Sequence, residues 1–449
     1  MSRVPAALAA RALGLSTQLI DALPAAAQYG IGRRVRNKLL SGRLPCIPMP
    51  SSQGKPIHQS ATESSGIPVL LVTGSLGTGG VEAVVALLAT EFRALGLTPV
   101  VLCAQGGNTA ERLSLEGVEV LIAPDRGSAD SILMDRHAIA VAQLHNPSAH
   151  LVDACVAAGL PLVQVVHNTD VFATAESWER ETALLESCDS AIAVSEVVRR
   201  FYLSRLPRRV DTPVAVIPNG VASGRAGRDR EESRALLGDV IGVTLGDATV
   251  FVCLARYELQ KNIPGLVSSF LRVDPSVHLV VAGPTDDWLE VRRAQAICRA
   301  DPTGGRIHLL GTSESGALMA AADGFLLDSF FEGWPIAGTE AIISGLPVVL
   351  AEVGGAAELA AQGRGVLISN PAVDPESIDG PAIRGARAAA TNQRNRSELK
   401  AAVEDIHSEI AGWREQRARR AAEAAAWATA PRMAAAHAEV LTTVVPRKS

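Results

Sequence analysis

The sequence predicts an α/β protein with two doubly wound domains, each built on a parallel sheet that helices cover on both faces. From residue 67 onward, short and almost continuous Val/Ile/Leu runs alternate with helical stretches. Such runs are typical of strands that are buried on both faces of a parallel sheet. The alternation is interrupted by the polar stretch 220–234 and then restarts, which indicates a second domain of the same kind.

The first series of expected strands belongs to an amino-terminal domain, residues 67–217. Helical stretches such as GGVEAVVALLATEFRALG separate these strands. The strands are expected in PVLLVTG (68–74), TPVVLCAQ (98–105), EVLIAP (119–124), IAVAQLH (139–145), PLVQVVHN (161–168), SAIAVSE (190–196) and TPVAVIPN (212–219).

The second series belongs to a carboxy-terminal domain, residues 218–425. Its strands are expected in TVFVCLAR (249–256), VHLVVAG (277–283), RIHLLG (306–311), GFLLDS (324–329), PVVLAE (347–352) and RGVLIS (364–369). The Ala-rich end of the chain is helical in pattern, with Pro431 as a break. Residues 426–449 are expected to form a helix that returns to the first domain, followed by a tail. Because ligands bind at the carboxyl ends of strands in such sheets, we expect a cleft between the domains.

Residues 1–66 differ from the rest of the chain, with eight Lys/Arg and two Asp/Glu. One interpretation is a basic element that is attracted to an anionic membrane surface. The other, which we prefer, is a partly flexible, partly helical extension that packs against nothing in particular. Arg11 interrupts the early apolar residues, which argues against a signal peptide, and no apolar run is long enough to span a bilayer. We therefore expect a cytoplasmic protein, with peripheral contact at the inner face of the membrane through this extension as a hypothesis.

The overall composition is that of an ordinary globular protein, and a chain of 449 residues is long enough for two separate cores. The formal net charge of −5 gives no reason to expect nucleic acid as a partner. The six cysteines lie far apart, so reduced thiols are expected rather than zinc ligands. The pair Asp286–Asp287 is interpreted as a helix cap, and no metal site is predicted.

The glycine-rich stretch IPVLLVTGSLGTGGVE (67–82) suggests backbone amides that face a phosphate, and hence a dinucleotide-dependent dehydrogenase. Tyr257 and Lys261 also have the Tyr-x3-Lys spacing of short-chain dehydrogenases. However, the glycines are not spaced Gly-x-Gly-x-x-Gly, and the next strand ends without the acidic residue that a ribose requires. The Tyr–Lys pair also begins an element instead of lying inside a helix. We therefore reject the dehydrogenase hypothesis.

The most informative stretch is FFEGWPIAGTEAII, which follows the expected strand 324–329. Pro335 suits the first turn of a helix. This places Glu332 in the loop before the helix and Glu340 inside it, with their carboxylates on the order of 10 Å apart along the axis. That separation is too large for a carboxylate pair that acts on one bond, but it suits two ends of an extended ligand. The N–H groups between the two residues form an anion site at the helix N-terminus.

These motifs resemble those of the retaining glycosyltransferase family 4. EGWPIAGTE matches its Glu-x7-Glu signature, SGLPVV…VGGAAE follows as in that family, and LARYELQKN resembles its Arg-x4-Lys element. VIPNGV, GTGGVE and VVHN resemble its interdomain segment, its glycine loop and the strand end that carries a histidine. The resemblance extends from residue 67 to about residue 445. It implies the GT-B architecture, with two Rossmann-like domains that face each other across a cleft.

The resemblance implies a role for each matching residue. Arg256 and Lys261 would bind the diphosphate of a nucleotide sugar, and Glu340 would bind its ribose. Glu332 and the backbone that follows would contact the donor sugar. His167 would lie beside the reacting sugar when the domains close. By the same resemblance, the residues that bind the donor would also include Gly79, Gly80, Gly333, Trp334, Pro335 and Ile336.

The implied activity is glycosyl transfer from a nucleotide-diphosphate sugar, UDP- or GDP-linked, to an acceptor hydroxyl with retention of configuration. The resemblance implies no cofactor and no bound metal. The acceptor would be a sugar, a lipid-linked sugar or a glycan in bacterial polysaccharide, glycolipid or glycoconjugate biosynthesis. His145 and Asn168 would lie on the acceptor side of the site. Two alternatives stay open: a non-transferase enzyme of the same fold, such as a nucleotide-sugar epimerase, and an inactive nucleotide-sugar-binding member.

Overall fold

The computed structural model describes residues 13–14, 17, 20, 31–49, 66–77, 79–135, 138–222 and 228–445. The chain forms two compact units. The carboxy-terminal unit takes its residues from 1–51 and 224–425, and the amino-terminal unit takes its residues from 52–223 and 426–449. The chain therefore passes from one unit to the other more than once.

The amino-terminal unit contains a seven-stranded parallel sheet with the order β3-β2-β1-β4-β5-β6-β7. Its central strands are buried along their whole length, as their apolar composition predicts. The strands are β1 (Ile67–Ser75), β2 (Leu97–Gln105), β3 (Glu119–Ile122), β4 (Val141–His145), β5 (Leu162–Val166), β6 (Ser190–Ala193) and β7 (Val214–Val216).

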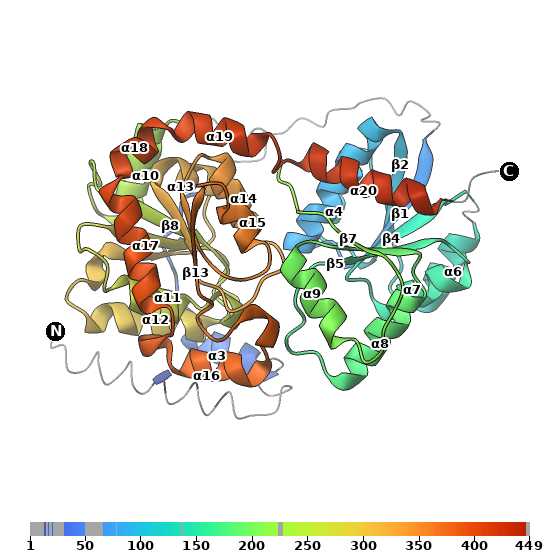
Figure 1. Cartoon of the computed structure of the whole chain (residues 1–449), viewed down its shortest axis with the longest axis horizontal. Coiled ribbons are helices and arrows are strands. Elements are labelled where there is room, and N and C mark those ends of the chain that lie inside the picture. The colour runs from blue at the N-terminus through green and yellow to red at the C-terminus, as the bar shows by residue number, and fades with distance from the viewer. Residues whose placement is uncertain are drawn as a thin grey trace. The chain divides into compact units, whose positions relative to one another are not determined.

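Helices between successive strands cover this sheet (Figure 1). They are α4 (Gly80–Glu91), α5 (Asn108–Leu115), α6 (Arg126–Met134), α7 (Ala149–Ala157), α8 (Ala175–Glu186) and α9 (Glu196–Arg205). The last helix of the chain, α20 (Ala430–Val444), packs against α4 and β4 of the same unit. A bridge between Val221 and Thr429 fixes its start, and a Cβ at Gly220 would overlap the backbone of Thr429.

The carboxy-terminal unit contains a six-stranded parallel sheet with the order β10-β9-β8-β11-β12-β13. Both sheets thus have a strand order that reverses next to their first strand, as in the Rossmann fold. The strands are β8 (Val250–Leu254), β9 (His278–Ala282), β10 (Ile307–Leu310), β11 (Gly324–Leu327), β12 (Val348–Ala351) and β13 (Gly365–Ile368).

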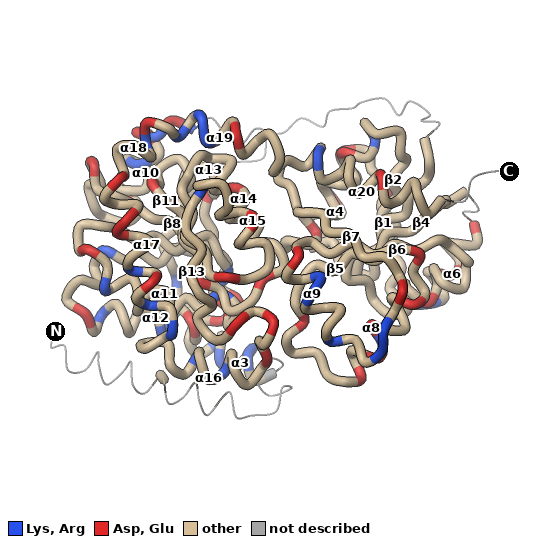
Figure 2. The backbone as a smooth tube through the Cα atoms, viewed as in Figure 1, with Lys and Arg blue, Asp and Glu red and all other residues tan. Residues whose placement is uncertain are grey.

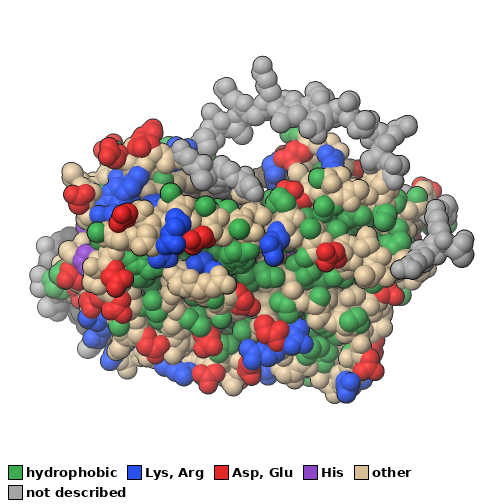
Figure 3. All heavy atoms as spheres, turned by 45° about the horizontal axis from the view of Figure 1, so that its top comes forward, with side chains coloured by type: hydrophobic (Ala, Val, Ile, Leu, Met, Phe, Trp, Pro, Cys, Tyr) green, Lys and Arg blue, Asp and Glu red, His purple; other side chains and the backbone are tan. Residues whose placement is uncertain are grey.

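The helices of the carboxy-terminal unit follow the same alternation until the last strand and then continue as a helical run (Figure 1). They are α10 (Arg230–Ile241), α11 (Ile263–Phe270), α12 (Trp288–Ala300), α13 (Ser315–Ala321), α14 (Ile336–Ile343), α15 (Ala356–Ala360), α16 (Gly380–Ala388), α17 (Arg396–Ser408), α18 (Ile410–Glu415) and α19 (Arg417–Ala425). The predicted fold class is confirmed, and each of the thirteen runs expected to be strands is one. Lys/Arg and Asp/Glu are interspersed over both units (Figures 2 and 3).

The expectation that the amino-terminal extension packs against nothing is wrong for residues 31–49. Helix α3 (Ile31–Leu40) packs against α12 of the carboxy-terminal unit. Its Arg36 forms an ion pair with Asp287 at 2.8 Å, and the side-chain amide of Asn37 donates to the Asp286 carbonyl at 2.8 Å. The basic charge pattern suggested a membrane-surface element or an unattached extension and gave no sign of these partners, which lie about 250 positions away.

The chain after α3 continues along the same unit and is held by backbone hydrogen bonds. The Gly311 N–H donates to the Pro45 carbonyl at 2.8 Å, and the Glu314 N–H donates to the Ile47 carbonyl at 3.2 Å. The Ile47 side chain is only 1% exposed. Ile47 therefore belongs to the core of the unit, and the segment around it is attached to that unit. The other residues of 1–66, apart from Leu13, Gly14, Thr17, Ile20 and Gly66, lie outside the described residues.

Candidate functional site

The loop after β8 carries the predicted Arg-x4-Lys element. Tyr257, next to Arg256, is fully buried, and its hydroxyl lies 2.9 Å from each of the Val281 and Leu310 carbonyls. Lys261 ends a 3₁₀ turn, and Asn262 then adopts a left-handed conformation with φ of 49°. Tyr257 is thus a core residue that turns away from Lys261, so the Tyr–Lys pair is no dehydrogenase site.

Lys261 and Glu332 form the centre of the candidate site. They follow β8 and β11, which are hydrogen-bonded neighbours, and the Lys261 Nζ lies 2.6 Å from the Glu332 Oε1. Both side chains are largely buried, with 15% and 6% exposed. Gln260 donates from its amide to the other carboxylate oxygen, Glu332 Oε2, at 3.2 Å. The sequence predicted both residues in the donor site but not this direct ion pair.

Arg256 is half exposed and lies between two carboxylates. Its Nη2 is 2.9 Å from the Glu258 Oε1, and its Nη1 is 3.4 Å from the Asp286 Oδ2. Burial raises the pKa of the Glu258 carboxyl, although Arg256 opposes this shift. Asp287 caps α12 by accepting from the Leu289 N–H, as the sequence predicted. Asp286 instead orients Arg256, a role that sequence reasoning missed.

A buried polar cluster holds the loop that carries Lys261. The Asp328 carboxylate, at the end of β11, accepts from the side-chain amides of Asn262 and Gln393 at 3.2 and 2.5 Å. The amide of Asn395 donates to its other oxygen at 2.8 Å. Burial raises the pKa of Asp328 to about 7, against the effect of these hydrogen bonds. Because Asn262 directly follows Lys261, this cluster fixes the position of the backbone from which the Lys261 side chain extends.

Two glycines explain how the loop before α14 is packed. Gly354 has φ of 45°, and a Cβ there would overlap the Gly333 carbonyl. A Cβ at Gly355 would overlap the Trp334 ring, while the Gly355 N–H donates to the Gly333 carbonyl at 3.0 Å. The indole N–H of Trp334 donates to the Thr339 hydroxyl at 2.8 Å. Trp334 therefore anchors the loop, and its side chain is only 5% exposed.

Helix α14 begins at Ile336, with Pro335 at its cap instead of in its first turn. Glu340 lies in the second turn and is partly exposed. The loop residues Glu332 to Pro335 precede the helix, so its free N–H groups follow the carboxylate that holds Lys261. Carboxylate, ammonium and helix N-terminus thus come together at the carboxyl ends of two neighbouring strands.

The other predicted residues lie in the amino-terminal unit. The His145 Nδ1 is 2.8 Å from the His167 Nε2, so the structure brings the two histidines together at the ends of β4 and β5. Burial lowers the pKa of His167 to about 4. Gly79 precedes α4 and Gly80 begins it, and a Cβ at Gly80 would meet none of the described atoms within 4 Å. The residue before Gly79 lies outside the described residues.

A cavity of about 730 Å³ opens in this unit between α7 and α8. His167 and Asn168 are among the residues that line it, so it includes two of the predicted residues. Trp178 and Tyr202 meet edge to face with ring centroids 5.8 Å apart, and the Tyr202 hydroxyl donates to the Glu181 carboxylate at 3.2 Å. Burial raises the pKa of Glu181.

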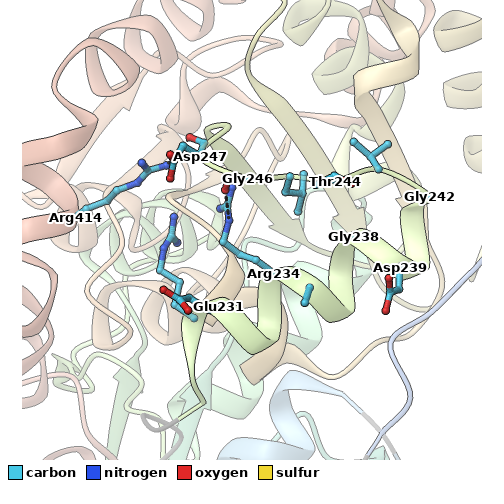
Figure 4. Close-up of a pocket in the computed structure, with 13 residues that line it drawn as sticks. Glu231, Arg234, Gly238, Asp239, Gly242, Thr244, Gly246, Asp247 and Arg414 are labelled. Carbon is cyan, nitrogen blue, oxygen red and sulfur yellow. Dashed lines mark hydrogen bonds between the residues drawn. The ribbon is translucent and has the colours of Figure 1, made fainter.

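A second cavity, of about 840 Å³, lies in the carboxy-terminal unit beside α10 and holds none of the predicted residues (Figure 4). Arg234 points across it to the Gly246 carbonyl, and Arg414 reaches toward Asp247 from the opposite side. Both arginines also bond the buried carboxylate of Asp323. These guanidinium groups tie backbone segments together, so this cavity is not part of the candidate site.

Two protein-family models match this chain. A family model described as Glycosyltransferase Family 4 matches residues 78–225, and one described as Glycosyl transferases group 1 matches residues 243–380. The chain belongs to glycosyltransferase family 4. The two family regions lie in the two units, and the second contains Arg256, Lys261, Glu332 and Glu340.

Relatives of this family-4 chain include the alpha-maltose-1-phosphate synthase of Mycolicibacterium smegmatis, which is 27% identical over 215 residues. The match covers 45% of this chain and 54% of that protein, so the chain spans about half the length of the curated relative it matches.

Solved structures share the GT-B fold. HepE of Anabaena in complex with UDP and glucose has 18% identity and a TM-score of 0.58, over 76% of this chain and 100% of that one. Sucrose-phosphate synthase from Thermosynechococcus elongatus has 15% identity and a TM-score of 0.65, over 84% and 98%.

Sequence reasoning missed several residues that support the site. Glu258, Asp286 and Asp328 are acidic residues at strand ends or in loops, which one sequence cannot distinguish from solvated carboxylates. His437 is buried in α20 and contacts Gln143 of β4. A lone histidine in an Ala-rich helix gives no signal of such a partner, 294 positions away.

Proposed function

We propose that this protein transfers a glycosyl group from a nucleotide-diphosphate sugar to an acceptor hydroxyl. The observation that supports this most is the Lys261–Glu332 pair at the ends of neighbouring strands, with Arg256 on the same loop. A departing nucleoside diphosphate gains negative charge in the transition state. Fixed cations and helix N–H groups in a largely buried site stabilise that charge where it develops.

Each residue of the donor site has one task in this proposal. Lys261 uses one N–H for Glu332 and has two more donors for a diphosphate oxygen. Arg256 adds a planar guanidinium that can bind phosphate with two N–H groups. Glu332 accepts hydrogen bonds from donor-sugar hydroxyls, and Glu340 accepts from the ribose. Gly79 and Gly80 carry no side chains, so the backbone at the start of α4 can approach a ligand closely.

The acceptor is proposed to bind to the amino-terminal unit. Its cavity of about 730 Å³ has a Trp and a Tyr beside amide and carboxylate groups, which together suit a polyhydroxylated ligand. His167 and Asn168, which line the cavity, are the groups proposed to approach the reacting hydroxyl. The proposed product keeps the configuration of the donor, and the proposed pathway class is polysaccharide, glycolipid or glycoconjugate synthesis.

The reaction is proposed to need neither cofactor nor bound metal, because Arg256 and Lys261 supply the positive charge. Among the residues that the structure describes, no group of three or more His, Cys, Asp or Glu side chains could hold a metal ion. Activity that persists in excess chelator would agree with this proposal. Loss of activity in chelator that Mg²⁺ restores would contradict it.

We also propose that the outer face of α3 contacts an anionic membrane surface. Residues 31–49 carry five Lys/Arg and no Asp/Glu, and Leu39 and Val35 are 79% and 53% exposed. Such a face suits the boundary between headgroups and acyl chains. No helix in the described part of the chain is both long enough and apolar enough to cross a membrane. Vesicles containing phosphatidylglycerol should sediment the protein, and Leu39→Glu should abolish this. Equal sedimentation of both proteins would contradict the proposal.

Thermal stabilisation by UDP, GDP, ADP and NAD, each with chelator, tests the donor site. A ligand at about 100 times its dissociation constant adds about 2.7 kcal/mol of stability. One of the first three should stabilise the protein, and Lys261→Ala should remove the effect. Lys400→Ala is a matched control, because Lys400 pairs with Glu404 elsewhere in the same unit. Stabilisation by NAD alone, or an equal loss in both variants, would contradict the proposal.

A further inference from the structure

A line of four hydrogen-bonded side chains runs from His167 into the core of the amino-terminal unit. After the contact between His167 and His145, the His145 Nε2 lies 3.1 Å from the Gln143 Oε1. The Gln143 Nε2 lies 2.9 Å from the His437 Nδ1. The line thus joins β5 and β4 to α20, the last helix of the chain.

All four side chains are enclosed by protein. Gln143, His145 and His437 are fully buried, and His167 is 8% exposed. Burial lowers the pKa of His437 to about 3 and that of His145 well below its usual range, with neighbouring imidazoles adding to the effect. At neutral pH the three imidazoles are therefore uncharged, and each has one N–H donor and one lone-pair acceptor.

This condition makes the hydrogen bonds interdependent. The Gln143 oxygen faces His145, so the His145 Nε2 must carry the proton and its Nδ1 must accept. The His167 Nε2 must then donate, which leaves its Nδ1 as a lone pair. At the other end, the Gln143 amide N–H donates to the His437 Nδ1, so the His437 Nε2 carries the proton.

One amide rotation would reverse the whole line. If the Gln143 amide were turned by 180°, every donor would become an acceptor, and the proton of His167 would move to Nδ1. The end of the line is the His437 Nε2, which is buried and has no hydrogen-bond partner among the described residues. The tautomer of His167 is thus coupled to a helix that lies 270 positions later in the sequence.

We infer that Gln143, His145 and His437 are positioning residues that hold His167 in the tautomer with the proton on Nε2. The Nδ1 is then the ring nitrogen that remains for a ligand, and it accepts a hydrogen bond from a ligand hydroxyl. The orientation of the ring is fixed by the same line. This inference rests on the proposed function only for the identity of that ligand.

The test measures the tautomer directly, without substrate. In protein with ¹⁵N-labelled histidine, the imidazole nitrogen shifts of His167 report which nitrogen is protonated, and His167→Gln assigns the signals. The wild type should show protonated Nε2 only. His437→Leu removes the end of the line and should produce a mixture of tautomers. His437→Gln keeps an acceptor for the Gln143 amide and should restore the single tautomer.

A matched control separates the line from the packing of α20. Met433 is buried on the same helix and does not belong to the line, so Met433→Leu should leave the shifts of His167 unchanged. Gln143→Met provides a second break if His437→Leu does not fold. A His167 proton that stays on Nε2 in both broken variants, or that lies on Nδ1 in the wild type, would overturn the inference.

Turnover provides the second measurement. Breaking the line should lower kcat by about 10- to 100-fold while the donor KM stays constant, because the reacting group is misplaced while the donor site is intact. His437→Gln should rescue kcat. If the tautomers mix but kcat does not change, the positioning role is refuted. If no donor is turned over by the wild type, the proposed function fails while the shifts still decide the tautomer claim.

Discussion

Replacement of Ile47 tests whether the segment before the first sheet is part of the folded carboxy-terminal unit. Ile47→Ala removes three carbon atoms from a side chain that is 1% exposed. The backbone holds this residue in place, because the Ile47 N–H donates to the Ser313 hydroxyl and the Ile47 carbonyl accepts from the Glu314 N–H. Lost burial and the resulting cavity should together cost about 3 kcal/mol. For a unit of this size, that corresponds to a fall in Tm of about 6–12 °C.

The matched control is Leu39→Ala in the same segment. Leu39 is 79% exposed, so its truncation should change stability by less than about 0.5 kcal/mol. Scanning calorimetry on the full chain, with and without the nucleotide that stabilises it, identifies which transition belongs to the carboxy-terminal unit. Equal melting of the two variants would refute the claim that Ile47 belongs to this core.

Three further predictions concern the sites themselves. Lys261→Met should destabilise the carboxy-terminal unit by about 1–3 kcal/mol, because Glu332 then keeps a largely buried charge without its partner lysine. In urea unfolding, the double variant Lys261→Met/Glu332→Gln should recover this stability, but it should not recover activity. Gly355→Ala should cost about 1–3 kcal/mol, since its Cβ would overlap the Trp334 ring, and a Tm equal to that of the wild type would contradict this packing. The pKa of His437 is lowered by burial to about 3, so the unfolded chain binds a proton below about pH 6.5 that the folded unit does not. The free energy of unfolding should therefore be unaffected by this histidine above about pH 6.5 and should fall by about 1.4 kcal/mol per pH unit on acidification toward pH 3. Unfolding curves of the wild type and of His437→Gln, measured over this pH range, should differ by this slope.

The sheets could be predicted from the sequence because buried parallel strands leave an almost uninterrupted apolar run. Runs such as LVQVV and HLVVA needed no knowledge of distant partners. The strand ends that carry Lys261 and Glu332 could be predicted for the same reason. Strand order then brings the two residues together, although they are 71 positions apart in the chain.

The remaining features depend on contacts that one sequence does not encode locally. Ile47 lies in the short segment LPCIP, which has no periodic pattern, so its burial could not be recognised. Asp328 could be placed at a strand end, but its three amide partners come from two distant loops. Physical chemistry explains these contacts once they are seen. The sequence does not predict them.

Release of nucleotide from a panel of UDP- and GDP-sugars tests the central claim most directly. The full chain should release nucleotide from one of these donors, faster when its acceptor is present, and NMR of the product should show the anomeric configuration of the donor retained. Lys261→Ala should lower the rate by at least about 100-fold, because a fixed cation at the leaving group is lost, while Lys400→Ala should keep it. Release that is equal in both variants, or the absence of release from every donor, would contradict the account.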